Sequence, residues 1–523
     1  MKSGRLYIKI LFYCCIIILL NTACAHLLTT EYGKIQNIRR GTVKIITTSI
    51  RPIYNIPWKM EGYNRDVGSG ALIEGNLILT NAHVVSDATY IEVQKENDPK
   101  KYSASVLYIG HDCDLALLKV HDDDFLIGTT TLRLSDRIPE LKSTVATFGY
   151  PKGGNRISIT EGVISRIETG SYSHSSYTPL LHIQTDAALN SGNSGGPVIQ
   201  NENIVGIAFQ IISSGENIGY LIPIPIIKHF LEDVSDNIYH GFPTLGVYWD
   251  KLENQSFRKY LGMVSNSTGM PSNSIGMGKN PSGILVNKVI SNSSAYSYLK
   301  DGDVILLIDG IKIANDGSIQ FEEGRISFSN LITSKQVGDT VQIEILREGK
   351  VIKQEFSLKK NEARIIWYNE YESLPRYFIF GGIIFQVLSR EFLKVNNEWW
   401  YYADPLFLYY YLYHDIDDIY PEREEFVIIN QVLPDPVNTY VSNISSVVVD
   451  TVNGIKITQL DDVIAAIEKP IGEYHIITYD NGVRPILLKA TDIKEANKRI
   501  LNNYRIPLDR RLNKYTGYGK NEN

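Results

Sequence analysis

The sequence is poor in cysteine, and this excludes one common way of stabilising an extracellular domain. It contains 4 cysteines in 523 residues. Cys14 and Cys15 lie within an apolar run near the N-terminus, which leaves only Cys24 and Cys113. These two residues cannot form a framework of several disulfides. We expect Cys113 to be a half-buried strand residue rather than a reactive thiol.

A long hydrophobic run and an excess of basic charge are also missing. The apolar run Ile10–Leu20 has 11 residues, whereas a membrane span needs about 17–25. The net charge of −6 gives no electrostatic reason to expect nucleic acid or anionic lipid as a partner. Long helical periodicity is scarce and the chain contains 40 glycines, so the composition favours β structure.

The N-terminal 25 residues have the layout of a secretory signal. Basic residues precede the apolar run, and the small residues of NTACAH follow it. We expect cleavage after Ala25 and export, with the bacterial periplasm or cell envelope as the destination. Two alternatives stay open. The signal could remain uncleaved as an anchor, or Cys24 could carry a lipid, because Asn21–Cys24 resembles a bacterial lipoprotein box.

Short apolar segments recur between glycine-containing turns from Gly41 to about Ile227. Many of them, such as GTVKIITT and LLHIQTDAAL, alternate in the two-residue period of half-buried strands. So many strands without amphipathic helices favour a barrel or a sandwich. Further along, DVILLIDGIKI and SVVVDTVNGIKI each predict a strand, a tight turn and a returning strand. This repetition predicts two related small domains.

The aromatic stretch Glu398–Asp415 could suggest a surface on which bases stack. Its neighbours are acidic and no basic groove accompanies it, which argues against nucleic acid. We expect these side chains to pack within the third domain or against a neighbour.

Three short motifs together predict a catalytic site. LTNAHVV places His83 at the end of a strand, HDCDLALLKV places Asp114 just before another, and NSGNSGGPV places Ser194 in a glycine-rich loop. A serine hydroxyl needs a base that takes its proton, and the base needs a third group that holds its tautomer. The chain order His, Asp, Ser is that of the chymotrypsin type. We interpret His83 as the base, Asp114 as the orienting group and Ser194 as the nucleophile.

Other acidic and basic residues near these motifs are alternatives. Asp112 lies two residues before Asp114 and would face the same side of an extended chain. His111 and Asp186 are also close to the motifs in sequence. We prefer Asp114 because it leads directly into an apolar strand, where a carboxylate can be shielded and oriented.

The glycines around Ser194 have a physical function in this interpretation. An oxyanion hole needs backbone N–H groups that converge on one point, which requires unusual backbone angles. The expected donors are the N–H groups of Gly192 and Ser194, with that of Asn193 close by. Gly195 and Gly196 would let the chain pass closely behind the nucleophile.

TNAHVV, DLALLKV, TEGVISRI, TDAALNSGNSGGPV and GIAF resemble the HtrA/Deg family of serine proteases. The resemblance covers nearly the whole chain after residue 30, and LGVYWDKLENQSFRKYLGM, YFIFGGIIFQVLS and NNYRIPLDRRL are similar to the plant-type Deg subgroup. It implies a mainly β fold, with a chymotrypsin-like double β-barrel protease domain followed by two PDZ-type α+β domains. The implied division is a signal peptide (1–25), a protease domain (30–238), a first PDZ domain (242–360), a divergent second PDZ domain (361–490) and a C-terminal tail (491–523).

The resemblance also implies a pocket that selects the substrate side chain before the scissile bond. The family often has GFAIP before the last barrel strand, whereas this chain has GYLIP. The bulkier side chains predict a shallow pocket for a small or medium apolar side chain. Its residues are Gly219, Tyr220 and Leu221.

In PDZ domains, a terminal carboxylate binds the backbone amides of a Leu-Gly turn while the peptide adds a strand. The match in the first PDZ domain is TLGV, with Leu245, Gly246 and Val247 as the binding residues. The second domain offers FGGI (Phe380–Ile383). Its glycines either bind a carboxylate in the same way or only lead into a strand.

The function implied by the resemblance is an exported, ATP-independent serine endopeptidase that degrades unfolded or damaged proteins. No metal or cofactor is expected, and C-terminal peptides would bind the first PDZ domain. The implied assembly is a trimer or a multiple of it. Tyr54, Trp58 and Tyr63, in a stretch interpreted as preceding the first barrel strands, are suited to a trimer contact. The alternative is a chaperone or peptide-binding scaffold with a mostly latent active site.

Overall fold

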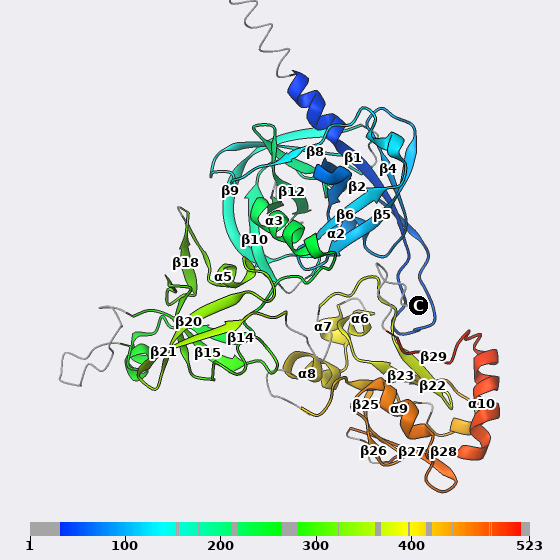
Figure 1. The fold of residues 1–523 in the computed structure, drawn as a ribbon. Coiled ribbons are helices and arrows are strands. Elements are labelled where there is room, and N and C mark those ends of the chain that lie inside the picture. Colours follow the sequence, from blue (N-terminus) through cyan, green and yellow to red (C-terminus); the bar gives the residue numbers. More distant parts are fainter. Residues whose placement is uncertain are drawn as a thin grey trace, which may run out of the picture.

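The computed structural model describes residues 32–513, except 153, 155, 176–177, 212–217, 264–280, 323, 361–367, 396–397, 415–420, 442, 481 and 483. Within these residues the chain forms two β-barrels followed by two smaller sheet-based units, so the expected fold class is confirmed (Figure 1). The expected signal peptide, with Ala25 and Cys24, lies outside the described residues. None of the described helices is long and apolar enough to cross a membrane.

The first barrel closes because each of its six strands pairs on both sides, in the order β1-β2-β3-β6-β5-β4. Val43 and Ile45 are two residues apart on β1, share one face and are fully buried in the barrel core. The helix α2 (Ala82–Val85) follows the third strand. The strands are β1 (Thr42–Ser49), β2 (Asn64–Ile73), β3 (Leu77–Thr80), β4 (Ala88–Gln94), β5 (Lys101–Gly110) and β6 (Leu115–Val120).

The second barrel has the order β11-β8-β9-β10-β13-β12 and closes through pairing of β12 with β11. β7 joins β12 in parallel outside the closed ring. The helix α3 (Ile224–Asp233) follows β13, and its Ile227 and Phe230 are fully buried. The strands are β7 (Arg133–Leu134), β8 (Thr144–Gly149), β9 (Ser158–Ser171), β10 (Pro179–Thr185), β11 (Pro197–Gln200), β12 (Asn203–Ile211) and β13 (Gly219–Pro223).

The first PDZ-type unit is an antiparallel sheet of order β14-β15-β16-β20-β21, to which β17 adds beside β16. Asp309 and Gly310 both have positive φ and turn β16 back into β17, which confirms the predicted strand-turn-strand. The helices are α4 (Gln255–Tyr260) and α5 (Ser329–Thr333). The strands are β14 (Val247–Lys251), β15 (Ile284–Val289), β16 (Val304–Ile308), β17 (Ile311–Lys312), β18 (Ser318–Phe321), β19 (Gly324–Ser327), β20 (Thr340–Arg347) and β21 (Lys350–Ser357).

The second PDZ-type unit has the order β28-β27-β25-β24-β23-β22-β29, and Asn453 and Gly454 make its matching turn from β25 to β26. Its strands are β22 (Tyr377–Phe380), β23 (Ile383–Val387), β24 (Val427–Val432), β25 (Val447–Val452), β26 (Ile455–Lys456), β27 (Tyr474–Tyr479), β28 (Ile486–Lys489) and β29 (Arg510–Arg511). Its helices are α6 (Arg390–Leu393), α7 (Trp399–Tyr402), α8 (Pro405–Tyr413), α9 (Leu460–Ile467) and α10 (Ala490–Asn503).

The aromatic stretch packs partly inside this second unit. Trp399, Phe407, Tyr410 and Tyr411 are buried in a cluster with residues of β24 and β25. Other aromatic side chains of α7 and α8 are exposed, among them Tyr401 at 85%. The predicted internal packing is therefore confirmed for only one face of α7 and α8.

The segment expected as a C-terminal tail is built into the same unit. Ala496 and Ile500 of α10 are buried against Tyr377 and Ile384 of the sheet. β29 then pairs with β22 and extends the sheet by one strand. Residues 491–511 are therefore part of the packed unit rather than a free tail.

We expected the stretch with Tyr54 and Trp58 to precede the barrel. It instead connects β1 to β2. It extends from the barrel to the second PDZ-type unit (Figure 1). The carbonyl of Tyr54 accepts a hydrogen bond from Gln386 (2.8 Å), and the Trp58 ring lies 6.1 Å from that of Tyr377. These two aromatics thus make contacts within one chain, whereas Tyr63 is 76% exposed.

Candidate active site

The three motifs of the predicted site converge where the two barrels meet. His83 lies on α2, directly after β3, and Asp114 immediately precedes β6 of the same barrel. Ser194 comes from the other barrel, in the loop between β10 and β11. Because β3 pairs with β6, the ends of these two strands bring His83 and Asp114 together.

The Asp114 carboxylate binds both the backbone and the ring of His83. Oδ1 accepts the backbone N–H of His83 at 2.8 Å, and Oδ2 lies 2.7 Å from its Nδ1. The Asp114 side chain is 1% exposed. Its backbone carbonyl accepts a hydrogen bond from the Asn81 side chain at 2.9 Å, and its φ of 53° is in the left-handed region. Aspartate tolerates that region at a cost of about 1 kcal/mol, so neighbouring contacts must hold it there.

The His83 ring is positioned to exchange a proton. Burial lowers the pKa of the ring, but the charge and the hydrogen bond of Asp114 raise it, and the net shift is upward. About a third of the side chain, 33%, remains exposed. The ring can therefore meet a substrate while the carboxylate stabilises its protonated form.

The Ser194 loop is held tightly against the first barrel. The Ser194 carbonyl accepts the backbone N–H of Ser69 at 2.8 Å, and the Ser69 hydroxyl donates to the Gly192 carbonyl at 2.7 Å. A Cβ on Gly195 would lie 2.1 Å from the Ser69 carbonyl oxygen, and one on Gly196 would lie 2.2 Å from that of Phe148. Only glycine therefore fits at these two positions. Ser69 was not singled out from the sequence, because a serine in a strand has no distinctive local signal.

Two backbone amides in this loop have no hydrogen-bond acceptor among the described residues. The Ser191 carbonyl accepts the Lys152 N–H at 2.6 Å, and in a trans peptide the following N–H, that of Gly192, points the opposite way. Within the described part of the chain, neither Gly192 N–H nor Ser194 N–H has a hydrogen-bond acceptor. The Asn193 N–H, by contrast, donates to the Asn190 carbonyl at 2.9 Å. Of the three amides expected, the first two are free for a ligand and the third is engaged.

The Ser194 hydroxyl is not yet directed at the base. It donates to the Phe209 carbonyl at 3.4 Å, and among the described residues no hydrogen bond joins it to His83. Hydrogen bonds of this kind are often long or misaligned before substrate binds.

The structure places the alternative residues elsewhere. Asp112 accepts hydrogen bonds from Tyr239 and from the Phe242 amide and lies 3.4 Å from the Lys360 ammonium, so it ties the protease unit to the first PDZ-type unit. Asp186 accepts the Val163 amide. Cys113 is fully buried rather than half-buried.

His111 belongs to another cluster near the site. Its Nδ1 lies 2.9 Å from Nε2 of His174 and its Nε2 lies 2.6 Å from Glu372, a residue of the linker between the two PDZ-type units. The sequence contained no signal for this grouping, because its members lie far apart along the chain.

The residues of the expected specificity pocket lie on β13. Gly219, Tyr220 and Leu221 are all buried. The Tyr220 ring lies 5.0 Å from that of His182 and 6.5 Å from that of Phe209, whose carbonyl binds Ser194. Tyr220 is therefore fixed by ring contacts in the second barrel.

The expected carboxylate-binding turn of the first PDZ-type unit leads into an edge strand. β14, which starts at Val247, is the end strand of its sheet. Gly246 has a φ of 75°, and a Cβ there would lie 2.0 Å from that of Ser293. Among the described residues, the amides of Leu245 and Gly246 have no hydrogen-bond acceptor.

The matching segment of the second unit is built differently. Gly381 and Gly382 form the tight turn between β22 and β23, and β23 is paired on both sides. The Gly381 N–H donates to Asn497 at 2.8 Å, and its carbonyl accepts from Asn438 at 2.7 Å. A peptide cannot add to a strand without a free edge, so these glycines serve the turn.

Profiles of known domains match the chain in succession. That of the trypsin-like peptidase domain matches residues 68–207, and those of PDZ domains match residues 243–358 and 366–512. The order and position of these matches agree with the barrels and the two sheet-based units.

Curated relatives match most of the chain. It is 36% identical over 470 residues to "Protease Do-like 4, mitochondrial" of Arabidopsis thaliana, covering 89% of this chain and 84% of that protein. It is 35% identical over 488 residues to "Protease Do-like 2, chloroplastic" of the same plant, covering 92% and 76%. A "Serine protease DegP homolog" of Plasmodium falciparum is 29% identical over 519 residues, covering 82% and 58%. The chain therefore belongs to the HtrA/Deg family of serine proteases, is similar to its plant members, and is a serine endopeptidase.

Proposed function

We propose that the protein hydrolyses peptide bonds through Ser194 as the nucleophile, His83 as the base and Asp114 as the group that orients His83. The observation that carries the proposal is the double contact of Asp114 with His83, to the backbone N–H at 2.8 Å and to Nδ1 at 2.7 Å. It fixes the proton of the neutral ring on Nδ1 and leaves Nε2 to accept the serine proton.

In this mechanism Ser194 attacks the scissile carbonyl while His83 takes its proton and then transfers it to the leaving amine. The negative charge on the carbonyl oxygen is received by the N–H groups of Gly192 and Ser194, which support the proposal by having no acceptor among the described residues. One such donor contributes about 3–4 kcal/mol to the stabilisation of the transition state. Asn193 contributes to the shape of the loop, since its own amide is engaged.

The substrates we propose are unfolded or damaged proteins, cut without ATP. Gly219, Tyr220 and Leu221 would form a shallow pocket for a small or medium apolar side chain before the scissile bond, and the fixed ring of Tyr220 supports a limited depth. The need for an extended chain in the cleft favours substrates that have lost their fold.

The first PDZ domain would capture C-terminal peptides. The free edge of β14 and the amides of Leu245 and Gly246 support this proposal, with Val247 starting the strand to which the peptide adds. The second PDZ domain has no such opening at its Gly-Gly turn. We assign it a role in positioning the linker and the β1–β2 connection.

We also propose delivery across a membrane, directed by the N-terminal segment, and assembly into trimers or their multiples. The names of the plant relatives favour an organelle over the bacterial periplasm that the signal pattern suggested. Fractionation with detection of the intact and processed chain distinguishes these compartments. Mass spectrometry of the mature N-terminus shows whether Cys24 carries a lipid.

A second function is favoured by the direction of the Ser194 hydroxyl. Because it donates to the Phe209 carbonyl, the chain could bind unfolded peptides as a chaperone while its active site stays latent. In that case denatured casein is bound but not cut, and replacing Ser194 has no effect on its capture.

A fluorophosphonate probe tests the main proposal, because only an activated serine reacts with it. We expect labelling of the wild-type protein at Ser194, none of Ser194→Ala, and digestion of casein without ATP. A wild-type protein that reacts with no probe and cuts no unfolded substrate, in any oligomeric state, would contradict the proposal and support the chaperone.

A further inference from the structure

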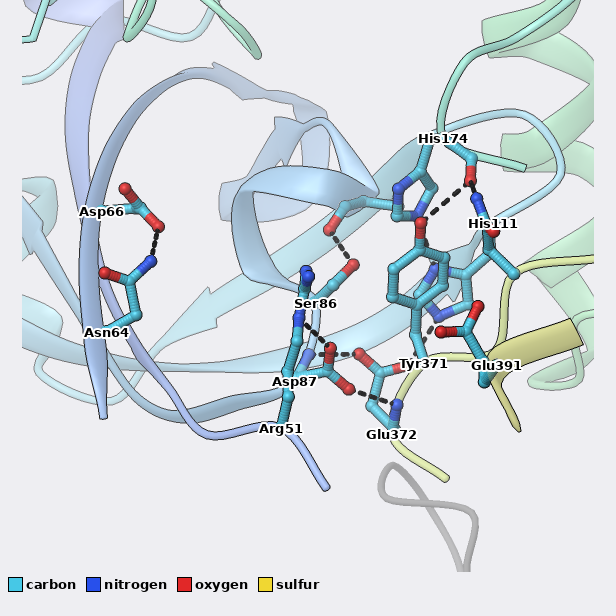
Figure 2. A network of polar contacts seen from close by, with 12 residues as sticks. Arg51, Asn64, Asp66, Ser86, Asp87, His111, His174, Tyr371, Glu372 and Glu391 are labelled. Carbon is cyan, nitrogen blue, oxygen red and sulfur yellow. Dashed lines mark hydrogen bonds and ion pairs between the residues drawn. The ribbon is translucent and has the colours of Figure 1, made fainter. Parts of the chain in front are cut away.

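The linker that joins the two PDZ domains contacts the protease domain next to the active site. Its described part, residues 368–376, contacts Asp87 just before β4 and His111 just after β5, and it then enters the second PDZ domain. Figure 2 shows Tyr371 and Glu372 of this linker among side chains of the first barrel, together with His174 from the β9–β10 connection. This segment is therefore part of the surface that surrounds the site.

Tyr371 inserts its ring against two histidines. It stacks on His174 with ring centres 4.0 Å apart and an interplanar angle of 18°, and on His111 at 4.7 Å and 25°. Its hydroxyl donates to the His174 carbonyl at 2.9 Å, and the Asn369 side chain donates to the same oxygen at 2.8 Å. The two imidazoles thus form a site that fits one aromatic ring.

This two-histidine site adjoins the proposed catalytic residues. The His174 ring centre lies 6.1 Å from that of His83, and His111 is three residues before Asp114. Burial raises the pKa of the Tyr371 hydroxyl, and the Asp114 charge raises it further, which reflects this proximity. An extended peptide advances about 3.3 Å per residue, so a substrate side chain two or three residues from the scissile bond would reach the site.

The linker is fastened by polar rather than apolar contacts. Glu372 lies 2.6 Å from Nε2 of His111, it accepts the Asp87 amide at 2.7 Å, and its own amide donates to Asp87 at 2.7 Å. Burial raises the pKa of the Asp87 carboxyl, the Glu372 carboxylate raises it further, and Arg51 at 3.0 Å counteracts this. The net contribution of such hydrogen bonds is small, because water replaces them when the linker leaves this site.

The linker also borders a pocket that is open to solvent. A cavity of about 380 Å³ lies beside it, lined in part by Arg51, Asp87, Glu370, Tyr371 and Glu391. Packing between domains explains the presence of contacts here, but it does not explain an aromatic ring stacked on two imidazoles beside the proposed base.

We propose that His111 and His174 form a substrate subsite for an aromatic side chain, and that Tyr371 of the linker occupies this subsite until substrate displaces it. This inference rests on the proposed function, because the subsite is defined relative to His83 and Ser194. Displacement releases Tyr371 from the site beside His83, while contacts such as that of Gln386 with Tyr54 still hold the second PDZ domain to the β1–β2 connection. While Tyr371 occupies the subsite, an extended substrate cannot bind. The apparent KM therefore exceeds the intrinsic KM by the reciprocal of the fraction of protein in which the subsite is free.

The test compares Tyr371→Ala with Tyr440→Ala, whose side chain is 95% exposed on the second PDZ domain. We expect Tyr371→Ala to lower the KM for fluorescent casein about 3- to 10-fold, the range set by one ring contact, with kcat changed less than about twofold. Tyr440→Ala leaves both unchanged. A synthetic peptide of residues 368–374, YNEYESL, inhibits Tyr371→Ala competitively, and the same peptide with alanine in place of its second tyrosine inhibits it less.

Two further measurements keep the result unambiguous. Glu372→Gln leaves the Tyr371 ring in place and removes the anion beside His111, so we expect KM to fall by a smaller factor than in Tyr371→Ala. Thermal melting shows whether either variant is folded. The labelling rate of Ser194 by a small fluorophosphonate stays within about twofold, because the probe does not reach the subsite. If all proteins are labelled but both linker variants keep the wild-type KM, the inference is wrong; if none is labelled, the proposed function itself fails.

Discussion

The Asp114 carboxylate binds His83 twice, through Oδ1 to the backbone N–H at 2.8 Å and through Oδ2 to Nδ1 of the ring at 2.7 Å. The first contact fixes the start of α2 against β6, and the second fixes the ring on that backbone. Position and protonation of the base therefore depend on the same carboxylate.

Asp114→Asn is expected to lower kcat/KM by about 10⁴-fold while leaving the fold intact, because an amide can hold the ring but favours the wrong tautomer. Hydrolysis of a peptide substrate measures the loss, and circular dichroism monitors the fold. Asp112→Asn is the matched control. Its side chain contacts Tyr239 and Lys360 rather than His83, so this variant should melt earlier and keep most of its activity.

The pH dependence should report the raised pKa of His83. The base acts in its neutral form, so kcat/KM rises with pH through a midpoint above about 6.5, the usual value for histidine. The same shift has the opposite effect on stability. The charged pair stabilises the fold below the unfolded pKa, and this contribution is lost as pH rises through the folded pKa.

Histidine NMR spectra of Ser194→Ala can measure that pKa without turnover. Adding Asp114→Asn to this variant removes the anion that raises the pKa of His83, and we expect the titration midpoint to move to lower pH. A midpoint that stays in place would mean that Asp114 does not set the charge of the ring.

Local patterns in the sequence predicted much of this architecture. The two-residue alternation gave the barrel strands, because burial of one strand face is a local property. The turns at Asp309–Gly310 and Asn453–Gly454 were predictable because few residues adopt the positive φ that they require. The motifs around His83, Asp114 and Ser194 were recognisable because each combines a reactive side chain with the local backbone that it needs.

Contacts between distant segments were not predictable in the same way. The Trp58 ring lies near that of Tyr377, and nothing in its own neighbourhood in the sequence identifies that partner. The C-terminal segment was expected as a tail because β29 consists only of Arg510–Arg511, which is too short for a strand pattern. The stacking of Tyr371 on His174 joins positions 197 residues apart and leaves no periodic signal.

Gly195→Ala should inactivate the enzyme more than it destabilises the chain as a whole. The new Cβ would lie 2.1 Å from the Ser69 carbonyl oxygen and 2.2 Å from the Thr80 hydroxyl, so the loop with the proposed oxyanion donors must move. We expect kcat to fall by about 10²-fold or more, the loss associated with one misplaced donor. Fluorophosphonate labelling should slow in parallel.

Gly128→Ala provides the control for that variant. Gly128 has a φ of 78°, close to the 81° of Gly195, but a Cβ there meets no atom within 4 Å. Both variants suffer the backbone strain of about 1–2 kcal/mol, and only one suffers the clash. Equal activity of the two variants would show that the close approach to Ser69 does not matter for catalysis.

Gly246→Ala tests the peptide site of the first PDZ domain. The φ of 75° and a contact of 2.0 Å between the new Cβ and that of Ser293 would displace the turn whose amides face the peptide carboxylate. We expect the Kd of a C-terminal peptide, measured by fluorescence anisotropy, to rise about 10-fold or more, since charge-assisted hydrogen bonds of about 1.5–3 kcal/mol are lost. Gly302→Ala, with a φ of 92° and no atom within 4 Å of its Cβ, should leave the Kd unchanged.

A peptide with an amidated C-terminus should bind the wild-type domain weakly, and Gly246→Ala should weaken its binding little further. Equal binding of the acid and the amide would assign recognition to the β14 edge alone.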